Sequence, residues 1–379
     1  MSSRLYLDVH ILQTVPPANL NRDDTGSPKS AIYGGVRRSR VSSQSWKRAT
    51  RQIFADELPK ADQATRTKRM QALLANRLAA KFNLPDPAAT NLSEALVSQL
   101  GIKAGAKKGD TSYLLFFGYQ QLDAIADLVA DRISELAALQ GDALAEAVKD
   151  LPVKEQLGSG HPLDVALFGR MVADVKGLNV DAAVQVAHAL STHAAAVEFD
   201  YFTAVDDENA ADESGAGMIG TVEFNSATLY RYATVGLHQL RDNLADTAAA
   251  VDALDLFTDA FARSMPTGHQ NTFAHRTLPH LVIASLREDQ PVNLVSAFER
   301  PVRTADGIAE ASMYRLADEH KAVTANWCKA PRLLAATGHT TDPKTEAALA
   351  DAFGPLVTFA ELREKIRQEA TAWYAKEAS

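Results

Sequence analysis

Hydrophobic and polar residues alternate along several short stretches of the chain, and this period of two predicts β-strands. In the first stretch, Leu5, Leu7, Val9 and Ile11 fall on one face and more polar residues on the other. An acidic, glycine-containing segment at 206–217 separates two later stretches, which is typical of a β-hairpin with a long tip. The predicted strands are residues 4–12, 197–205, 218–233 and the apolar run 281–286.

Elsewhere, apolar positions recur at the spacing of an amphipathic helix. Ser42 or Ser43 is expected to cap a first helix that ends near Leu58. Thr358 and Glu361 form a capping-box pattern that begins the last helix. The other predicted helices are residues 70–82, 119–139, 181–193 and roughly 246–264.

In chain order, the predicted core is strand, helix, helical insertion, two strands, helix and strand. Without the insertion, this is the order of the ferredoxin-like split βαβ fold, which RNA-recognition motif (RRM) domains share. We therefore expect an α+β protein with an RRM-like core. Its predicted divisions are a first core segment at 1–59, a helical insertion at 60–195, a second core segment at 196–300 and a mainly helical part at 301–379.

The composition is that of a globular protein. The chain has 379 residues, of which 46% are hydrophobic, so it can bury a sizeable core. Its single cysteine, Cys328, excludes an internal disulfide framework and a cysteine-based zinc finger. No signal-peptide pattern begins the sequence, and no apolar run is long enough to cross a bilayer. We expect a soluble cytoplasmic protein with no membrane partner.

One basic segment stands out in this acidic chain. Residues 25–55 contain seven basic and no acidic side chains, although the formal net charge of the whole protein is -8. A charge run is usually a solvated helix face, but such faces normally mix both signs. Gly34 and Gly35 would let the backbone approach a ligand closely, and the arginines that follow suit phosphate oxygens. The segment therefore predicts binding of a polyanion.

The histidines do not form a recognisable metal site. His188 and His193 are five residues apart on a predicted helix, so they would not share a face, and apolar neighbours favour a core position for His188. Three further histidines lie in one loop without a regular ligand spacing, namely His269, His275 and His280. No metal and no cofactor is expected.

Two pairs of adjacent aspartates could hold Mg²⁺ for phosphodiester hydrolysis, Asp23–Asp24 and Asp206–Asp207. Adjacent side chains on extended backbone point to opposite sides, which disfavours a shared ion. A turn and the base of a hairpin are the favoured interpretations. The nucleophile and kinase motifs of familiar enzymes are absent from the sequence, so an enzyme is not expected.

The positions of three apolar residues can be interpreted in two ways. Met171 ends a short apolar run, and Met218 and Ile219 lie where the predicted hairpin turns back. A core position is the default, above all for Met171. Proteins that deform nucleic acids also use such side chains as wedges between stacked bases.

Seven motifs occur in a fixed order and carry a resemblance to a known family. They are LNRDD (20–24), GGVRRSRVSSQSWKRA (34–49), DVALFGRM (164–171), VAHALSTH (186–193), DYFTAVDD (200–207), GTVEF (220–224) and LYRYA (229–233). On these motifs, the chain closely resembles the CasC family, the backbone subunit of the type I-E CRISPR surveillance complex Cascade. The similarity is weakest at 60–160 and in the last forty or so residues.

The resemblance implies a palm, which is the RRM-like core, helical fingers and a thumb hairpin at about 200–225. Several copies would polymerise along one CRISPR RNA, grip its backbone and kink it at regular intervals. The bases between the kinks would pair with target DNA. Other Cascade subunits and a recruited helicase–nuclease, which does the cutting, would be the further partners.

The resemblance also assigns roles to residues. The guide-binding residues it implies are Asn21, Arg22, Lys29, Arg37, Arg38, Arg40, Lys47, Arg48 and Arg51, through side chain or backbone. The wedge and thumb residues are Met171, Phe202, Met218 and Ile219. Where members of the family can carry lysine, this chain has Val36, so a contact could be missing there or be replaced by Lys29.

Two alternatives remain. Related backbone subunits of type III complexes cut RNA with a loop aspartate, for which Asp23 or Asp24 would be the candidate here. A stand-alone RRM-like protein that binds cellular RNA is the other.

Overall fold

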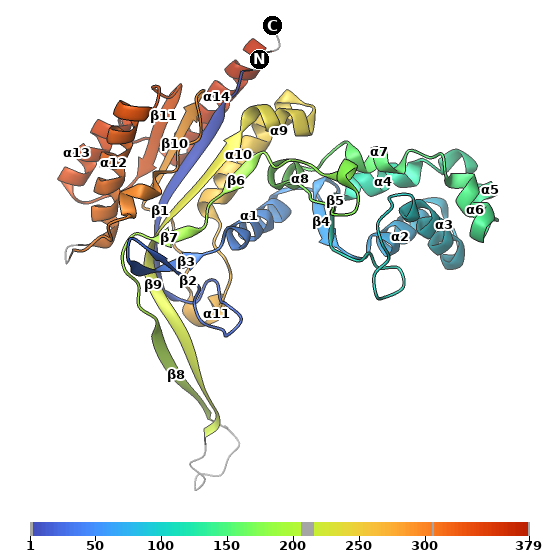
Figure 1. The fold of residues 1–379 in the computed structure, drawn as a ribbon, viewed down its shortest axis with the longest axis horizontal. Coiled ribbons are helices and arrows are strands. Elements are labelled where there is room, and N and C mark those ends of the chain that lie inside the picture. The colour runs from blue at the N-terminus through green and yellow to red at the C-terminus, as the bar shows by residue number, and fades with distance from the viewer. Residues whose placement is uncertain (1–2, 206–215, 305–306, 378–379) are drawn as a thin grey trace. The chain divides into compact units, whose positions relative to one another are not determined.

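A computed structural model describes residues 3–205, 216–304 and 307–377 of the chain (Figure 1). The protein divides into two compact units, each assembled from segments that are distant in sequence. The sheet unit comprises Met1–Gln52, Val186–Val235 and Leu254–Ser379. The helical unit comprises Ile53–Gln185 and Gly236–Ala253.

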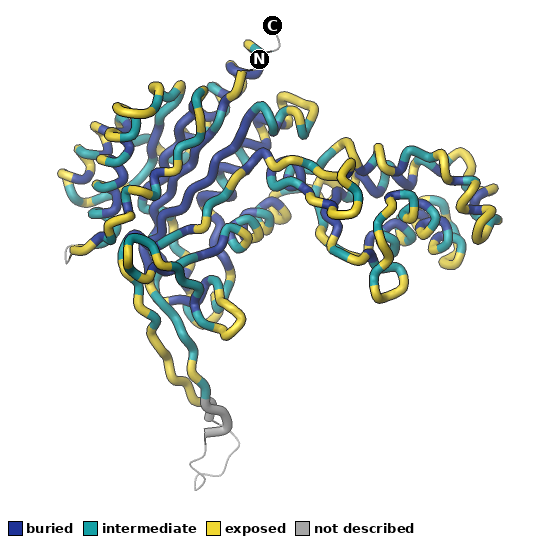
Figure 2. The backbone as a smooth tube through the Cα atoms, in the orientation of Figure 1, coloured by how far each residue is buried: buried dark blue, intermediate teal, exposed yellow. Residues whose placement is uncertain are grey.

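A nine-stranded sheet runs through the described part of the chain, in the order β11-β10-β1-β9-β7-β3-β2, and β8 pairs with β9 off this path. β1 pairs antiparallel with β10 from Tyr6 opposite Arg287 to Leu12 opposite Leu281. Figure 2 shows these central strands as largely buried. The strands are β1 (Tyr6–Ala18), β2 (Ser30–Tyr33), β3 (Val36–Val41), β6 (Val184–Val186), β7 (Ala189–Ser191), β8 (Glu198–Val205), β9 (Ala216–Gly236), β10 (Leu281–Arg287) and β11 (Leu333–Gly338).

Helices cover both faces of this sheet. Tyr230 and Tyr232 of β9 join a core cluster with residues of α12 and α13 on one face. Arg231, between them, lies against Trp46 and Phe261. Because side chains alternate along a strand, α1 and α10 pack on the opposite face. The elements outside the sheet are α1 (Ser43–Glu57), α10 (Thr247–Arg263), α11 (Gln270–Phe273), η4 (Leu294–Phe298), α12 (Ile308–Trp327), α13 (Pro343–Phe353) and α14 (Phe359–Glu377).

The helical unit has its own hydrophobic core, which includes Leu74, Leu92, Phe117 and Ile125. Buried Arg170 donates to the carbonyl oxygens of Leu178 and Leu157, and desolvation lowers its pKa to about 10. The elements of this unit are η1 (Lys60–Asp62), β4 (Ala64–Thr67), α2 (Met70–Phe82), α3 (Asp86–Ser98), β5 (Leu115–Gly118), α4 (Tyr119–Asp127), η2 (Ala130–Arg132), α5 (Ile133–Leu136), α6 (Gly141–Val148), α7 (Val153–Gly158), α8 (Leu163–Phe168), η3 (Lys176–Leu178) and α9 (Leu237–Leu244).

Several predictions that rest on local signals are confirmed. α1, α2 and α10 lie where periodicity predicts them, and β8, β9 and β10 match the predicted strands. The Thr358 hydroxyl accepts from the Glu361 backbone, and the Glu361 carboxylate accepts from the Thr358 backbone, so the capping box forms. The mixed α and β class is confirmed as well. None of the described helices is long and apolar enough to cross a membrane.

The predicted helix at 181–193 is wrong, because this segment forms β6 and β7 instead. Leu190 of β7 lies opposite Arg40 of β3 on one side and Tyr230 of β9 on the other. Sheet neighbours distant in sequence thus satisfy the backbone that a helix would have paired internally. The predicted helix at 119–139 also stops early, at Asp127, and short helical turns follow it.

The β2–β3 hairpin is a feature that periodicity missed. Its turn residues Gly34 and Gly35 have φ values of 59° and 76°. Positive φ at both central positions is what a type I′ hairpin turn requires. A Cβ on Gly34 would also lie 1.6 Å from the carbonyl oxygen of Glu299. The glycine pair therefore serves the hairpin and its packing against the segment after η4.

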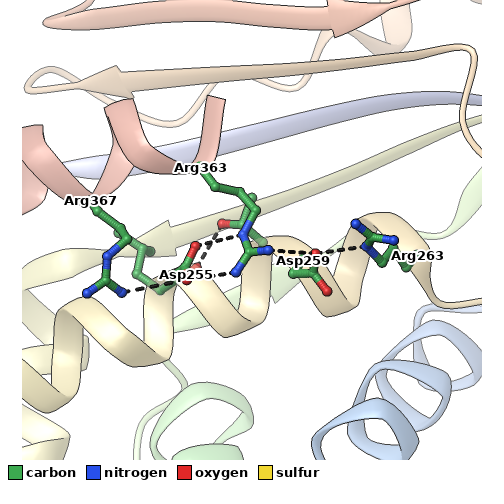
Figure 3. A network of polar contacts seen from close by, with 7 residues as sticks. Asp255, Asp259, Arg263, Arg363 and Arg367 are labelled. Atoms are coloured by element: carbon green, nitrogen blue, oxygen red, sulfur yellow. Dashed lines mark hydrogen bonds and ion pairs between the residues drawn. The ribbon is translucent and has the colours of Figure 1, made fainter. Parts of the chain in front are cut away.

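An ion-pair network joins the last helix to α10 (Figure 3). Arg363 of α14 donates twice to Asp255, at 2.8 and 2.7 Å, and once to Asp259, at 2.9 Å. Arg263 donates to Asp259 at 2.8 Å, and Arg367 lies 3.6 Å from Asp255. Shared and bidentate contacts of this kind stabilise more than isolated surface pairs do, because each side chain is ordered only once.

The polar face of β1 is buried rather than solvated. Asp8 accepts from the Tyr232 hydroxyl at 2.8 Å and from the Val292 backbone at 2.9 Å, and Arg287 lies 3.7 Å away. Desolvation raises the pKa of Asp8 to about 6, against the opposing effect of these hydrogen bonds and of Arg287. The alternation of β1 therefore separates an apolar face from a buried polar face.

Two histidines belong to the same buried region. His10 of β1 shares a 2.9 Å hydrogen bond with Tyr230, and burial lowers its pKa to about 3. His320 of α12 lies against Phe353, and burial followed by the charge of Arg287 lowers its pKa to about 4. Within the described residues, neither ring nitrogen of His320 has a hydrogen-bond partner. Both imidazoles are therefore neutral in the folded protein at neutral pH.

These histidines predict loss of stability in acid. When the pKa of a histidine is lower in the folded than in the unfolded state, the folded protein is most stable above about pH 6.5, where the ring is neutral in both states. As pH falls toward the folded-state pKa, the unfolded chain takes up the proton first and the free energy of unfolding falls. Asp8, whose pKa is raised, changes the free energy of unfolding in the opposite direction between about pH 4 and 6. The combined effect of the two histidines is larger than that of this one carboxylate. We expect Tm to fall between pH 6.5 and 4, and His320→Leu, which keeps the packing against Phe353, to flatten that fall. Calorimetry measures Tm at each pH. An equally steep fall of Tm in the variant and the parent would contradict this account.

Candidate nucleic-acid interface

A cleft of about 620 Å³ opens on the sheet unit, beside the start of the basic helix. Three segments line it, namely the β1–β2 loop, the exposed side of α1 and the loop that precedes α11. Two arginines from separate segments, Arg22 and Arg48, meet there. The polar and charged lining residues are Asn21, Arg22, Asp23, Asp24, Ser45, Arg48, Gln52, Thr267 and His269.

Hydrogen bonds fix the β1–β2 loop in place. Asn19 donates to the carbonyl oxygens of Gly26 at 3.0 Å and of Glu223, at the root of the β8–β9 hairpin, at 2.8 Å. Asn21 accepts from the Ser42 backbone at 2.9 Å, next to the beginning of α1. This side chain therefore connects the loop to the helix that carries Arg48.

Asp23 organises the tip of the loop. One of its carboxylate oxygens accepts from the Thr25 hydroxyl at 2.7 Å and from the backbones of Thr25 and Ser27 at 2.9 and 3.0 Å. The Thr25 hydroxyl is the main cause of the lowered pKa of this exposed carboxyl. The turn interpretation of Asp23 is confirmed, whereas Asp206 and Asp207 lie outside the described residues. Within the described part, no three His, Cys, Asp or Glu side chains are grouped to hold a metal.

α1 presents its cations because its other face is anchored. Trp46 is fully buried, and the Arg231 guanidinium lies 3.7 Å from the centre of its ring. Arg231 donates to Gln13 at 2.6 Å and to the Phe261 carbonyl oxygen, and burial lowers its pKa to about 9. Arg48, two residues after Trp46, points away from this anchor and is exposed. Lys47 and Arg51 are half-buried on the same helix.

A second basic cluster lies around β3. Arg40 donates to the Ser30 carbonyl oxygen at 3.2 Å and to Nδ1 of His188 at 3.1 Å. A guanidinium can only donate, so His188 accepts through Nδ1 as a neutral ring. Its pKa is lowered, first by desolvation and then by Arg40 and Lys29. The predicted core position of His188 is wrong, because the residue is exposed.

Arg38 differs from its neighbours in the basic segment. It is fully buried and donates to the carbonyl oxygens of Tyr33 at 3.1 Å, Ser191 at 3.0 Å and Phe298 at 2.7 Å. Desolvation lowers its pKa. Arg37 is exposed instead, since consecutive strand residues point to opposite faces. The Arg38 side chain is therefore enclosed by protein, and only its backbone remains for the predicted phosphate contact.

The predicted wedge residues lie in different units. Met171 is 84% exposed in the helical unit, so its default interpretation as a core residue is wrong. In the sheet unit, the Phe202 ring lies across Gly220, where a Cβ would come within 2.4 Å of it. The β8–β9 register places Met218 opposite Ala204 and Ile219 opposite Thr203. The side chains at 218 and 219 lie outside the described part of the structure.

The sequence does not identify His269, which lines the cleft, or Arg231, which supports the helix beside it. His269, considered there only as a metal ligand, accepts through Nε2 from Arg22 at 3.1 Å. Arg231 stands at an inward position of an alternating strand, which is the signal that could have marked it as buried. The partners of both residues are distant in sequence, so the pairings themselves leave no local pattern.

Neighbouring arginines of β3 provide a matched test of the buried role. Arg38→Ala removes a guanidinium that satisfies several buried carbonyl oxygens, so we expect the free energy of unfolding to fall by roughly 3 kcal/mol or more. Arg37→Ala should change it by no more than about 0.5 kcal/mol, because the side chain is exposed. Urea denaturation measures both values. Similar small losses in the two variants would show that the carbonyl contacts of Arg38 contribute little.

Comparison with known proteins adds the family. A solved structure titled "CRISPR RNA-guided surveillance complex, pre-nicking" is similar at 33% identity and a TM-score of 0.83, over 96% of this chain and 100% of that chain. Another, titled "CRISPR RNA-guided surveillance complex", is similar at 28% identity and a TM-score of 0.74, over 96% and 99%. No curated protein sequence matches. The model of the Cas family described as CT1975-like protein matches residues 7–364, and the chain belongs to that family.

Proposed function

We propose that this protein is the CRISPR RNA-binding backbone subunit of a type I-E Cascade, of the CasC type, and that its copies polymerise along one guide. The observation that carries the proposal is the cleft that Arg22 and Arg48 both line, on a sheet unit whose basic segment exposes Arg37 and Arg48. Family membership and the similarity to CRISPR surveillance complex chains support it.

The palm in this proposal is an RRM-like core. β1 lies between β9 and β10 in the sheet, so the first strand of the core is central and the later strands flank it. That placement is in keeping with a split βαβ arrangement. α1 and α10, which connect the core strands in the chain, pack on one face, and α1 presents Arg48 to the cleft.

The grip is on the guide backbone. A guide must be held whatever its sequence, and phosphate contacts position a nucleic acid without reading its bases. Arg22 and Arg48 in the cleft and Lys29, Arg37 and Arg40 near β3 supply positive charge for this purpose. The cationic strips of successive copies would form one groove along the strand.

The β8–β9 hairpin is the thumb. Phe202 is 40% exposed on it, and Met171 is 84% exposed in the fingers. Exposed apolar side chains of this kind can wedge between bases and kink a strand. Met218 and Ile219 complete the wedge set. The bases between kinks would then pair with target DNA, which a recruited helicase–nuclease cuts.

The subunit itself acts as a cytoplasmic scaffold without catalysis. Three donors from the turn occupy one oxygen of the Asp23 carboxylate. This engagement favours a loop-forming role for Asp23 over that of a nuclease ligand.

Removing the two cleft arginines tests the proposal. Arg22→Ala combined with Arg48→Ala should weaken binding of a labelled single-stranded guide RNA. The salt slope, which is the slope of the logarithm of the binding constant against the logarithm of the salt concentration, should fall in magnitude by about 0.7 for each lost phosphate contact. Fluorescence anisotropy over a range of salt concentrations gives both quantities. Lys344→Ala on α13 is the matched control, since it removes an exposed cation away from the cleft. Unchanged affinity and slope in the double variant would exclude the cleft as the grip.

A further inference from the structure

Arg22 is aligned by an imidazole rather than by a carboxylate. Its Nη1 lies 3.1 Å from Nε2 of half-buried His269. The guanidinium has only donors, so Nε2 must be the acceptor and the ring hydrogen must sit on Nδ1. The neutral ring agrees with the lowered pKa of His269, which desolvation causes first and the charge of Arg22 second.

The backbone around His269 is fixed at a close approach. A Cβ on Gly268 would lie 2.5 Å from the Leu20 carbonyl oxygen and 2.6 Å from that of Asn19, so the two loops touch through their main chains. His269 itself has a φ of 52°, in the left-handed region that residues other than glycine seldom adopt. Such conformations persist where the surrounding structure enforces them.

Aromatic rings hold the imidazole from the other side. The His269 ring lies 6.2 Å from that of Phe273 in α11, and Phe273 lies 5.7 Å from Phe224 of β9. Phe224 is opposite Glu198 at the root of the thumb hairpin. The imidazole thus lies between Phe273, which connects it to the hairpin root, and Arg22 of the β1–β2 loop, to which its acceptor nitrogen is directed.

The kind of acceptor matters for a cation that must bind phosphate. A carboxylate would align Arg22 equally well, but it would cancel the charge and repel the ligand. A neutral imidazole aligns the guanidinium and leaves its charge available. We infer that His269 is a positioning residue that directs Arg22 at guide phosphate in the cleft, an inference that rests on the proposed function.

Four variants of the full chain test this role with labelled single-stranded guide RNA. His269→Ala should bind roughly tenfold more weakly and lose about 0.7 from the salt slope, as Arg22→Ala does. In the Arg22→Ala background, His269→Ala should add no further loss, because the imidazole acts through Arg22. His269→Gln, a neutral acceptor, should restore most of the affinity. His269→Glu, an acceptor of similar size with a charge, should not.

The outcomes separate the two proposals. If removal of Arg22 and Arg48 leaves binding intact, the proposed function fails. If that removal weakens binding but His269→Ala costs as much again in the Arg22→Ala background, only the positioning role fails. Equal binding by the Gln and Glu variants would also overturn it. Thermal melts identify any variant that unfolds. If His269→Ala unfolds, the comparison of the nearly isosteric His269→Gln and His269→Glu variants decides whether His269 positions Arg22.

Discussion

The burial of Arg231 against aromatic rings and neutral acceptors is the interaction on which the candidate interface depends. Its guanidinium lies 3.7 Å from the Trp46 ring centre and 4.7 Å from that of Phe261, and it donates to Gln13. These contacts join α1 and α10 to β9. Because Trp46 fixes the inner face of α1, Arg48 is presented on the outer face.

Neutral acceptors of the same kind satisfy two arginines of the basic segment and Arg22 of the loop before it. Arg38 donates to backbone carbonyl oxygens and holds the β2–β3 hairpin. Arg22 and Arg40 donate to histidine nitrogens. Carbonyl oxygens and imidazoles satisfy the donors without cancelling charge, so these arginines keep their positive charge in a protein of net charge -8. A strip that binds polyanions requires arginines whose charge is not cancelled, since paired carboxylates would weaken the attraction for the polyanion.

Local signals in the sequence predicted much of the fold. The first helix, the capping box at Thr358 and the long hairpin follow from spacing within a few residues. The strands β6 and β7 could not be predicted in this way, because their partners are distant and override a helix-like pattern. For the same reason, charge alone could not separate buried Arg38 from exposed Arg37. The cleft could not be predicted either, because Arg22 and His269, which contact each other in it, lie on loops that are distant in sequence.

The central claim is that copies of this chain assemble along one guide. Native mass spectrometry of the full chain with single guides of increasing length tests it most directly. The account predicts that bound copies increase in steps, with a constant number of nucleotides added for each copy. A single copy on every guide, whatever its length, would contradict polymerisation and would fit a stand-alone RNA-binding protein.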